Sequence, residues 1–133
     1  MFNWNPVADL PEPTPQLSPI DVVKIQLDAL QNNDIMPHNQ GLHIAFQHTS
    51  PTHKKAINSL ETFAQLLTTS LYRAMIGFER AELETLHLNG DIARQIVRLI
   101  HKEDEVLYSF LLSQQQTAPY IGCWMTDAML PLD

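Results

Sequence analysis

The chain has one cysteine, four glycines and eight basic residues among its 133, and each scarcity excludes a class of protein. The single Cys123 excludes an internal disulfide. The start of the sequence has no basic, apolar leader, and together these two features predict a reducing, cytoplasmic location. Eight Lys and Arg against 15 Asp and Glu give a net charge of −7, which disfavours nucleic acid and anionic membranes as partners. The sequence contains no apolar run that approaches membrane-spanning length.

What is present is a chain with 44% hydrophobic residues, enough to bury one core without disulfides or metal. The first 17 residues contain four prolines, which deny helix and predict an extended arm over 1–17. Phe2 and Trp4 lie near the tip of this arm, either as part of a frayed terminus or as an aromatic anchor on the same or a neighbouring subunit. Residues 18–133 are predicted to form one domain.

Three segments have helical patterns. Ser18 is a good cap and Pro19 fits the first helical position, so we expect a helix to about residue 33. A short second helix over 41–49 should end at Ser50-Pro51, and the polar segment 52–56 reads as a connector. Asn58 is predicted to cap a third helix that ends between 70 and 74.

Four segments after Phe78 have strand patterns. Asn89-Gly90 predicts a tight turn between two alternating runs. The next segments, over 92–100, 106–113 and 120–130, are separated by a turn at Glu103-Asp104 and by a polar loop. Helices followed by an antiparallel meander predict an α+β domain with helices on one face of the sheet.

Alternation along these strands divides their side chains between two faces. The face toward the helices is predicted to carry Leu86, Leu88, Ala93, Val97, Leu99, Tyr108, Phe110 and Leu112. The opposite face is predicted to carry Leu83, Ile92, Ile96, Ile100, Leu107 and Leu111. Six large apolar side chains on an uncovered face indicate a homodimer interface, with Ile92, Ile96, Ile100, Leu107 and Leu111 as its candidates.

Three stretches resemble small uncharacterised proteins of the nuclear transport factor 2-like superfamily. They are the helix opening Ser18-Pro19-Ile20-Asp21-Val22-Val23 with Leu27-Asp28-Ala29-Leu30-Gln31-Asn32-Asn33-Asp34, the 46–51 segment with its Ser50-Pro51, and the closing Tyr120-Ile121-Gly122-Cys123-Trp124-Met125-Thr126-Asp127. The resemblance implies a cone in which helices wrap a curved antiparallel sheet around a pocket, with dimerisation through the outer sheet face. It leaves the function open, because the superfamily includes isomerases, dehydratases and non-enzymatic binding proteins. The chain lacks the hairpin common between the second and third helices of the superfamily, and residues that match an isomerase's acid and base.

A pocket in such a cone would be lined by the few polar residues near its apolar wall. The candidates for ligand binding are Tyr72, Gln95, Tyr108, Trp124 and Asp127. One hypothesis is a module that binds a small hydrophobic ligand or a protein partner, with no catalytic residue and no cofactor assigned. The alternatives are a lyase or isomerase that uses Asp127 with Tyr72 or Tyr108, and an assembly protein in a larger complex. If the site is only structural, both tyrosines bury their rings and point their hydroxyls at backbone or water.

The remaining reactive side chains favour structural roles. Four histidines recur at intervals of five, which is poor spacing for metal ligands on a helix, so no metal site is predicted. Cys123 lies in a predicted strand, where burial would make its thiol inert. The acidic residues around 79–84 and 103–105 read as solvated sheet edges or, alternatively, as a docking surface for a basic partner.

Overall fold

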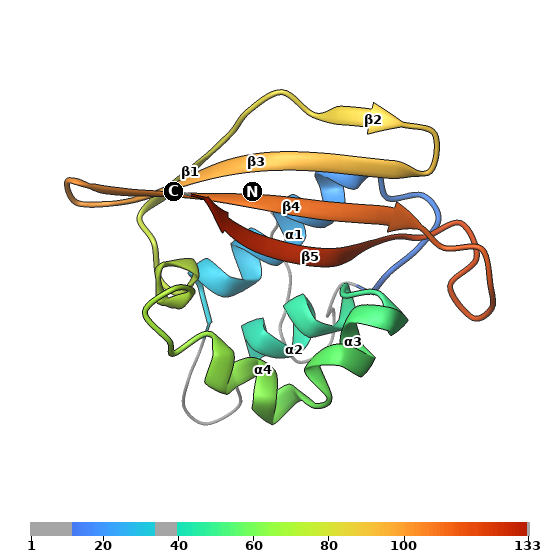
Figure 1. The fold of residues 1–133 in the computed structure, drawn as a ribbon, viewed down its shortest axis with the longest axis horizontal. Coiled ribbons are helices and arrows are strands. Elements are labelled where there is room, and N and C mark those ends of the chain that lie inside the picture. Colours follow the sequence, from blue (N-terminus) through green and yellow to red (C-terminus); the bar gives the residue numbers. More distant parts are fainter. Residues whose placement is uncertain (1–11, 34–39, 133) are drawn as a thin grey trace.

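The computed structural model describes residues 12–33 and 40–132, and Figure 1 shows helices on one side of a curved sheet. The helical elements are α1 (Pro19–Gln31), α2 (Gln40–Gln47), α3 (Pro51–Ile57), α4 (Leu60–Leu66) and the 3₁₀ helix η1 (Arg73–Met75). The strands are β1 (Arg80–Leu83), β2 (His87–Asn89), β3 (Ile92–His101), β4 (Asp104–Gln114) and β5 (Trp124–Leu132). All pairings are antiparallel in the order β1-β3-β4-β5, and β2 also pairs with β3. The predicted α+β class is confirmed, whereas Phe2 and Trp4 lie outside the described residues.

Helix α1 begins as the sequence predicts. The Ser18 hydroxyl accepts a hydrogen bond from the Asp21 N–H at 3.1 Å, and the Asp21 carboxylate accepts one from the Ser18 N–H at 2.9 Å. This reciprocal pair satisfies two N–H groups that the first helical turn leaves unpaired. The buried face of α1 then supplies Val22, Val23 and Leu30 to the core.

The segment 52–56, predicted as a connector, belongs instead to α3. Its start is visible in the sequence, because Ser50 is its cap and accepts the His53 N–H at 3.2 Å, and Pro51 occupies the first helical position. The Ser50-Pro51 pair, predicted to end a helix, therefore begins one, because α2 already ends at Gln47. Asn58, predicted to cap the third helix, has φ 89° and ends α3, and Ser59 caps α4.

Helix α4 also ends earlier than predicted, at Leu66. The next residues include Thr68 and Thr69, whose hydroxyls donate to the carbonyls of Gln65 and Leu66 at 2.7 Å each. Such local bonds compete with helix continuation, so the chain turns through 67–72 before η1.

Both predicted hairpin turns occur, each one residue away from its expected place. Asn89 stays in β2 opposite Ile92, so the first loop is Gly90 and Asp91, with φ 63° at Gly90. Positive φ at the first loop position is what glycine permits at no steric cost. In the second hairpin His101 pairs with Asp104, so the turn is Lys102-Glu103 and Asp104 begins β4.

The prediction for the face of Leu83 is wrong. In β1, Leu83 lies opposite Val97, on the face toward the helices, and it packs against the core. In β2, His87 lies opposite Arg94. Leu83 and His87 are four residues apart, whereas their partners in β3, Val97 and Arg94, are three residues apart. Because side chains alternate along a strand, this extra residue between β1 and β2 places Leu83 on the face opposite to the predicted one.

Candidate functional site

The space between helices and sheet, where a ligand pocket was expected, is occupied by the protein's own side chains. Phe63, Met75, Tyr108 and Phe110 are each 0–1% exposed and belong to one core cluster with α1 and the sheet. The Tyr72 ring stacks on that of Tyr108, with centroids 6.1 Å apart and planes inclined by 25°. The interior at this end of the sheet is therefore packed core.

The Tyr108 hydroxyl is committed to the backbone. It donates a hydrogen bond to the Leu71 carbonyl at 2.7 Å, which ties β4 to the turn before η1. Burial, and secondarily the charge of a neighbouring Tyr72, raises the pKa of Tyr108 to about 12. Burial also raises the pKa of Tyr72. Both side chains are neutral at physiological pH and read as structural.

Gln95 fills the break between β1 and β2. Its side chain is fully buried, and its amide group donates to the Glu84 carbonyl and, at 3.0 Å, to the Ile96 carbonyl. Glu84 lies in the stretch between the two strands where the extra residue occurs. The Ile96 carbonyl also accepts the Glu84 N–H at 2.9 Å, so the Gln95 side chain adds hydrogen bonds that tie the segment between β1 and β2 to β3.

Trp124 and Asp127 lie at the other end of the sheet from the two tyrosines. Tyr108 is opposite Pro131, and Trp124 is opposite Gln114, six residues further along β4, or about 20 Å. Asp127 sits at the irregularity in the pairing of β4 with β5, and its charge acts on His53 of α3. The structure brings together Tyr72 and Tyr108 but not the five predicted pocket residues.

A buried polar cluster joins α1, the α2–α3 connection and β5, and sequence reasoning missed it. Thr126 exchanges backbone hydrogen bonds with the 48–50 segment, donating to the His48 carbonyl at 2.9 Å and accepting from the Ser50 N–H at 2.8 Å. The cluster consists of Gln26, His48, Thr49, Ser50 and Thr126, all 0–1% exposed. A polar residue on a helix normally reads as solvent-facing, so only the flanking apolar Ile25 and Leu27 hint that Gln26 is buried.

The outer face of the sheet carries the predicted interface residues. The register places Ile92, Ile96, Ile100, Leu107 and Leu111 on the face opposite the core. Ile92 is 58% exposed and Leu130 of β5, on the same face, is 44% exposed. Ile96, Leu107 and Leu111 are half-buried, whereas Ile100 is only 6% exposed. The exposed apolar part of this face is thus centred on β3, β4 and β5.

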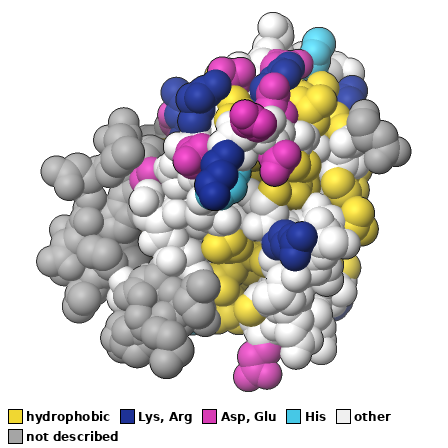
Figure 2. All heavy atoms as spheres, turned by 90° about the vertical axis from the view of Figure 1, so that its left-hand side faces the viewer, with side chains coloured by type: hydrophobic (Ala, Val, Ile, Leu, Met, Phe, Trp, Pro, Cys, Tyr) yellow, Lys and Arg dark blue, Asp and Glu magenta, His cyan; other side chains and the backbone are white. Residues whose placement is uncertain are grey.

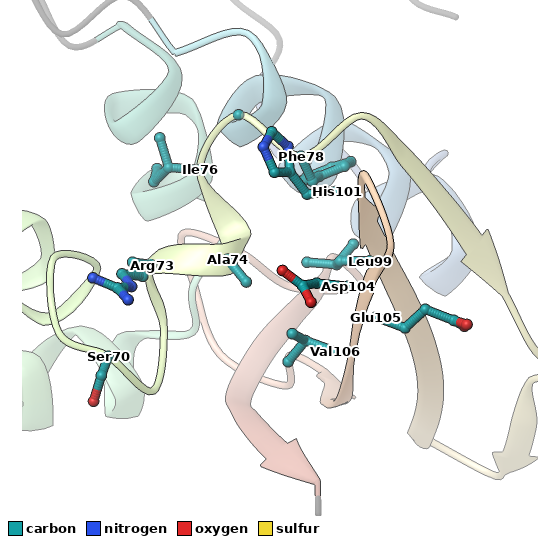
Figure 3. Close-up of a pocket in the computed structure, with 11 residues that line it drawn as sticks. Ser70, Arg73, Ala74, Ile76, Phe78, Leu99, His101, Asp104, Glu105 and Val106 are labelled. Atoms are coloured by element: carbon teal, nitrogen blue, oxygen red, sulfur yellow. The ribbon is translucent and has the colours of Figure 1, made fainter.

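A hollow of about 580 Å³ lies between η1 and the β3–β4 hairpin (Figure 3). Ala74, Ile76, Phe78, Leu99 and Val106 give it apolar walls, and Ser70, Arg73, His101 and Asp104 contribute polar groups. Figure 2 shows this end of the molecule, where acidic and basic side chains gather above exposed hydrophobic ones.

Alternation along β4 explains which acidic side chain reaches the hollow. Asp104 shares the side of Val106 and Tyr108, so its carboxylate points toward the hollow (Figure 3). Glu105 faces the other side, where it accepts a hydrogen bond from Arg98 at 2.9 Å. The sequence shows the same alternation, but the predicted turn at Glu103-Asp104 wrongly left Asp104 outside the strand.

Comparisons with family models, curated proteins and solved structures gave no match. The site must therefore be interpreted from its own chemistry.

The described residues contain neither a cluster of metal-ligand side chains nor a helix of membrane-spanning length. Across residues 12–33 and 40–132, no group of three or more His, Cys, Asp and Glu side chains is arranged to hold a metal ion. His43 is exposed on α2, and His48 is buried in the polar cluster. No helix in these two ranges has the length and apolar character needed to cross a bilayer.

Proposed function

We propose that this protein is a cytoplasmic binding module that works as a homodimer, with the outer faces of two sheets packed together. The observation that carries the proposal is an apolar surface on the outer face of the sheet, formed by the exposed Ile92 and Leu130 and the half-buried Ile96, Leu107 and Leu111. Contiguous apolar surface of this kind usually marks an interaction site. The resemblance to the nuclear transport factor 2-like superfamily, which remains a proposal, agrees with this use of the sheet.

The charges on the same face favour a second copy of the chain as the occupant. At one end, Arg98 forms ion pairs with Glu84 at 3.1 Å and with Glu105 at 2.9 Å. Glu82 lies 3.5 Å from Arg80 and 3.8 Å from Arg98, so three carboxylates share two guanidinium groups. This end is therefore net negative.

At the other end of the face, Arg94 is exposed and donates a hydrogen bond to the Ser109 hydroxyl at 3.1 Å. Within the described residues it has no carboxylate within ion-pair distance. A two-fold axis through the apolar centre would bring Arg94 of one copy to the acidic end of its partner. Such a face is self-complementary, as an isologous interface requires.

The enzyme alternative is less well supported by the geometry. A lyase or isomerase would need Asp127 beside Tyr72 or Tyr108, whereas Asp127 lies near Leu112, about 13 Å along β4 from Tyr108. The Tyr108 hydroxyl is occupied by the Leu71 carbonyl. The proposal therefore places the function on the surface rather than in the interior.

Sedimentation velocity tests the proposal. The wild type should sediment with twice the 15.1 kDa chain mass. Ile96→Asp should shift the protein to monomer, because burying an unpaired carboxylate costs about 3 kcal/mol or more, equivalent to at least ~100-fold in affinity. Ile121→Asp is the matched control, because Ile121 is 60% exposed in the β4–β5 loop. A monomeric wild type, or a dimer unaffected by Ile96→Asp, would refute the proposal.

A further inference from the structure

The hollow between η1 and the β3–β4 hairpin has the size and composition of a small-molecule site. Its volume of about 580 Å³ falls within the range of roughly 300–1,000 Å³ typical of ligand pockets. Apolar walls with a few polar groups from different elements are also typical of such sites. Here the polar groups come from η1, from the end of β3 and from the start of β4.

Two opposite charges line the hollow without neutralising each other. Figure 3 shows Arg73 and Asp104 on opposite sides, with Ala74 between them in that view. In the described part of the chain neither side chain takes part in an ion pair, in contrast to Arg98 and Glu105 nearby. The lining thus offers one cationic and one anionic contact that a bound molecule can satisfy.

The position of each charge is fixed by local structure. Met75 is fully buried and anchors η1 in the core, so its neighbours Arg73 and Ala74 are held at the edge of the hollow. Gly77, with φ 70°, turns the chain from η1 toward β1. Asp104 is held by its pairing with His101 at the end of the hairpin. Both charges are presented on ordered elements rather than on a long loop.

We propose that this hollow binds a small zwitterion with an apolar side chain, of the class of free hydrophobic amino acids. The ligand carboxylate would contact Arg73, its ammonium group would contact Asp104, and its side chain would lie against Leu99 and Val106. A purely cationic ligand would meet Arg73 as a like charge, and a purely anionic ligand would meet Asp104. A zwitterion satisfies both groups, and charge-assisted hydrogen bonds are the strong ones.

Isothermal titration calorimetry with L-leucine and L-phenylalanine, up to about 10 mM, tests the proposal. Leucinamide lacks the carboxylate and N-acetyl-leucine lacks the ammonium group, so each should bind at least about tenfold more weakly than leucine. Arg73→Gln should weaken leucine binding to the same extent and remove the preference for leucine over leucinamide. Asp104→Asn should weaken leucine and remove its preference over N-acetyl-leucine.

Two control variants separate the site from general charge effects. Glu103→Gln changes the acidic residue adjacent to Asp104 in the turn, and Lys55→Gln changes an exposed basic residue on α3. Both should bind leucine as the wild type does, and thermal melting should show that all variants are folded. Ile96→Asp should also retain leucine binding, because the hollow does not include the outer sheet face. The dimer proposal and the ligand proposal can therefore fail independently of each other.

Three results would overturn the proposal. The first is the absence of leucine and phenylalanine binding throughout the titrated range. The second is binding that neither Arg73→Gln nor Asp104→Asn weakens. The third is equal or tighter binding of leucinamide or N-acetyl-leucine, which would assign the hollow to a simple cation or a simple anion.

Discussion

The Thr126 hydroxyl donates a hydrogen bond to the Gln26 Oε1 atom at 2.6 Å, although 100 residues separate the two in the chain. Gln26 in turn donates from Nε2 to the Ala45 carbonyl at 2.9 Å. Both side chains are 0% exposed. One buried amide thus joins α1, α2 and the last strand, and fixes how the helical layer sits on the edge of the sheet.

Thr126→Val should lower the free energy of unfolding by about 1–3 kcal/mol. The substitution keeps the side-chain volume nearly constant but leaves Gln26 Oε1 buried without its donor. Urea denaturation measures the change. Thr117→Val, at an exposed loop position, is the matched control and should change stability by no more than about 0.5 kcal/mol. Equal effects of the two substitutions would show that the buried bond contributes little.

Tyr108 should make the fold sensitive to alkaline pH. Its pKa of about 12 in the folded protein exceeds the value of about 10 expected in the unfolded chain. The stability that comes from burying the neutral phenol is therefore complete below pH ~10 and is lost as the pH rises through about 12. Urea midpoints at pH 9 and pH 11 should differ in the wild type, and the difference should be smaller in Tyr108→Phe, where the raised pKa values of Tyr72 and Cys123 still contribute. An equal separation in Tyr108→Phe would contradict this assignment.

His53 should be neutral in the folded protein at physiological pH. Burial lowers its pKa, against opposing contributions from the Thr126 carbonyl and the Asp127 charge. A lowered pKa means that His53 adds stability above pH ~6.5 and that this stability is lost as the pH falls through the folded-state value. NMR titration of the imidazole should give a pKa below 6.5 in the wild type and a still lower pKa in Asp127→Asn. A higher pKa in Asp127→Asn would refute the proposed interaction.

Cys123 should be inert while the protein is folded. The residue is 3% exposed, and burial raises the pKa of its thiol, so little reactive thiolate forms. A thiol-specific disulfide reagent should label it slowly in buffer and quickly in denaturing urea. Cys123→Ser should cost about 1–3 kcal/mol of stability, because the new hydroxyl enters a buried position. Rapid labelling of the native protein would return the thiol to the functional candidates.

Local sequence was enough to predict the elements whose signals are short-range. The cap at Ser18, the turn around Gly90 and the alternation along β3 and β4 place α1, the hairpin and two sheet faces. These features depend on steric limits and hydrogen bonds between near neighbours, which the sequence contains directly. The same alternation predicted that Ile92, Ile96, Ile100, Leu107 and Leu111 share one face.

The sequence-based prediction failed where an insertion or shift of one residue decides which face of the sheet a side chain occupies. The extra residue between β1 and β2 turned Leu83 inward, and a turn one residue earlier than predicted brought Asp104 into β4. Neither is marked by glycine or proline, because both are set by how the strands pair. Pairing is a long-range property, and a shift of one residue exchanges the two faces.

The sequence by itself determined the class of fold, the capped first helix and the apolar character of both sheet faces. Only the tertiary structure decided that the interior is packed, that Tyr72 and Tyr108 are remote from Asp127, and that Arg73 shares a hollow with Asp104. The physical reason is that periodicity specifies which way a side chain points within its own element. Which groups then meet depends on the packing of elements that are distant in the chain, and no local pattern encodes it.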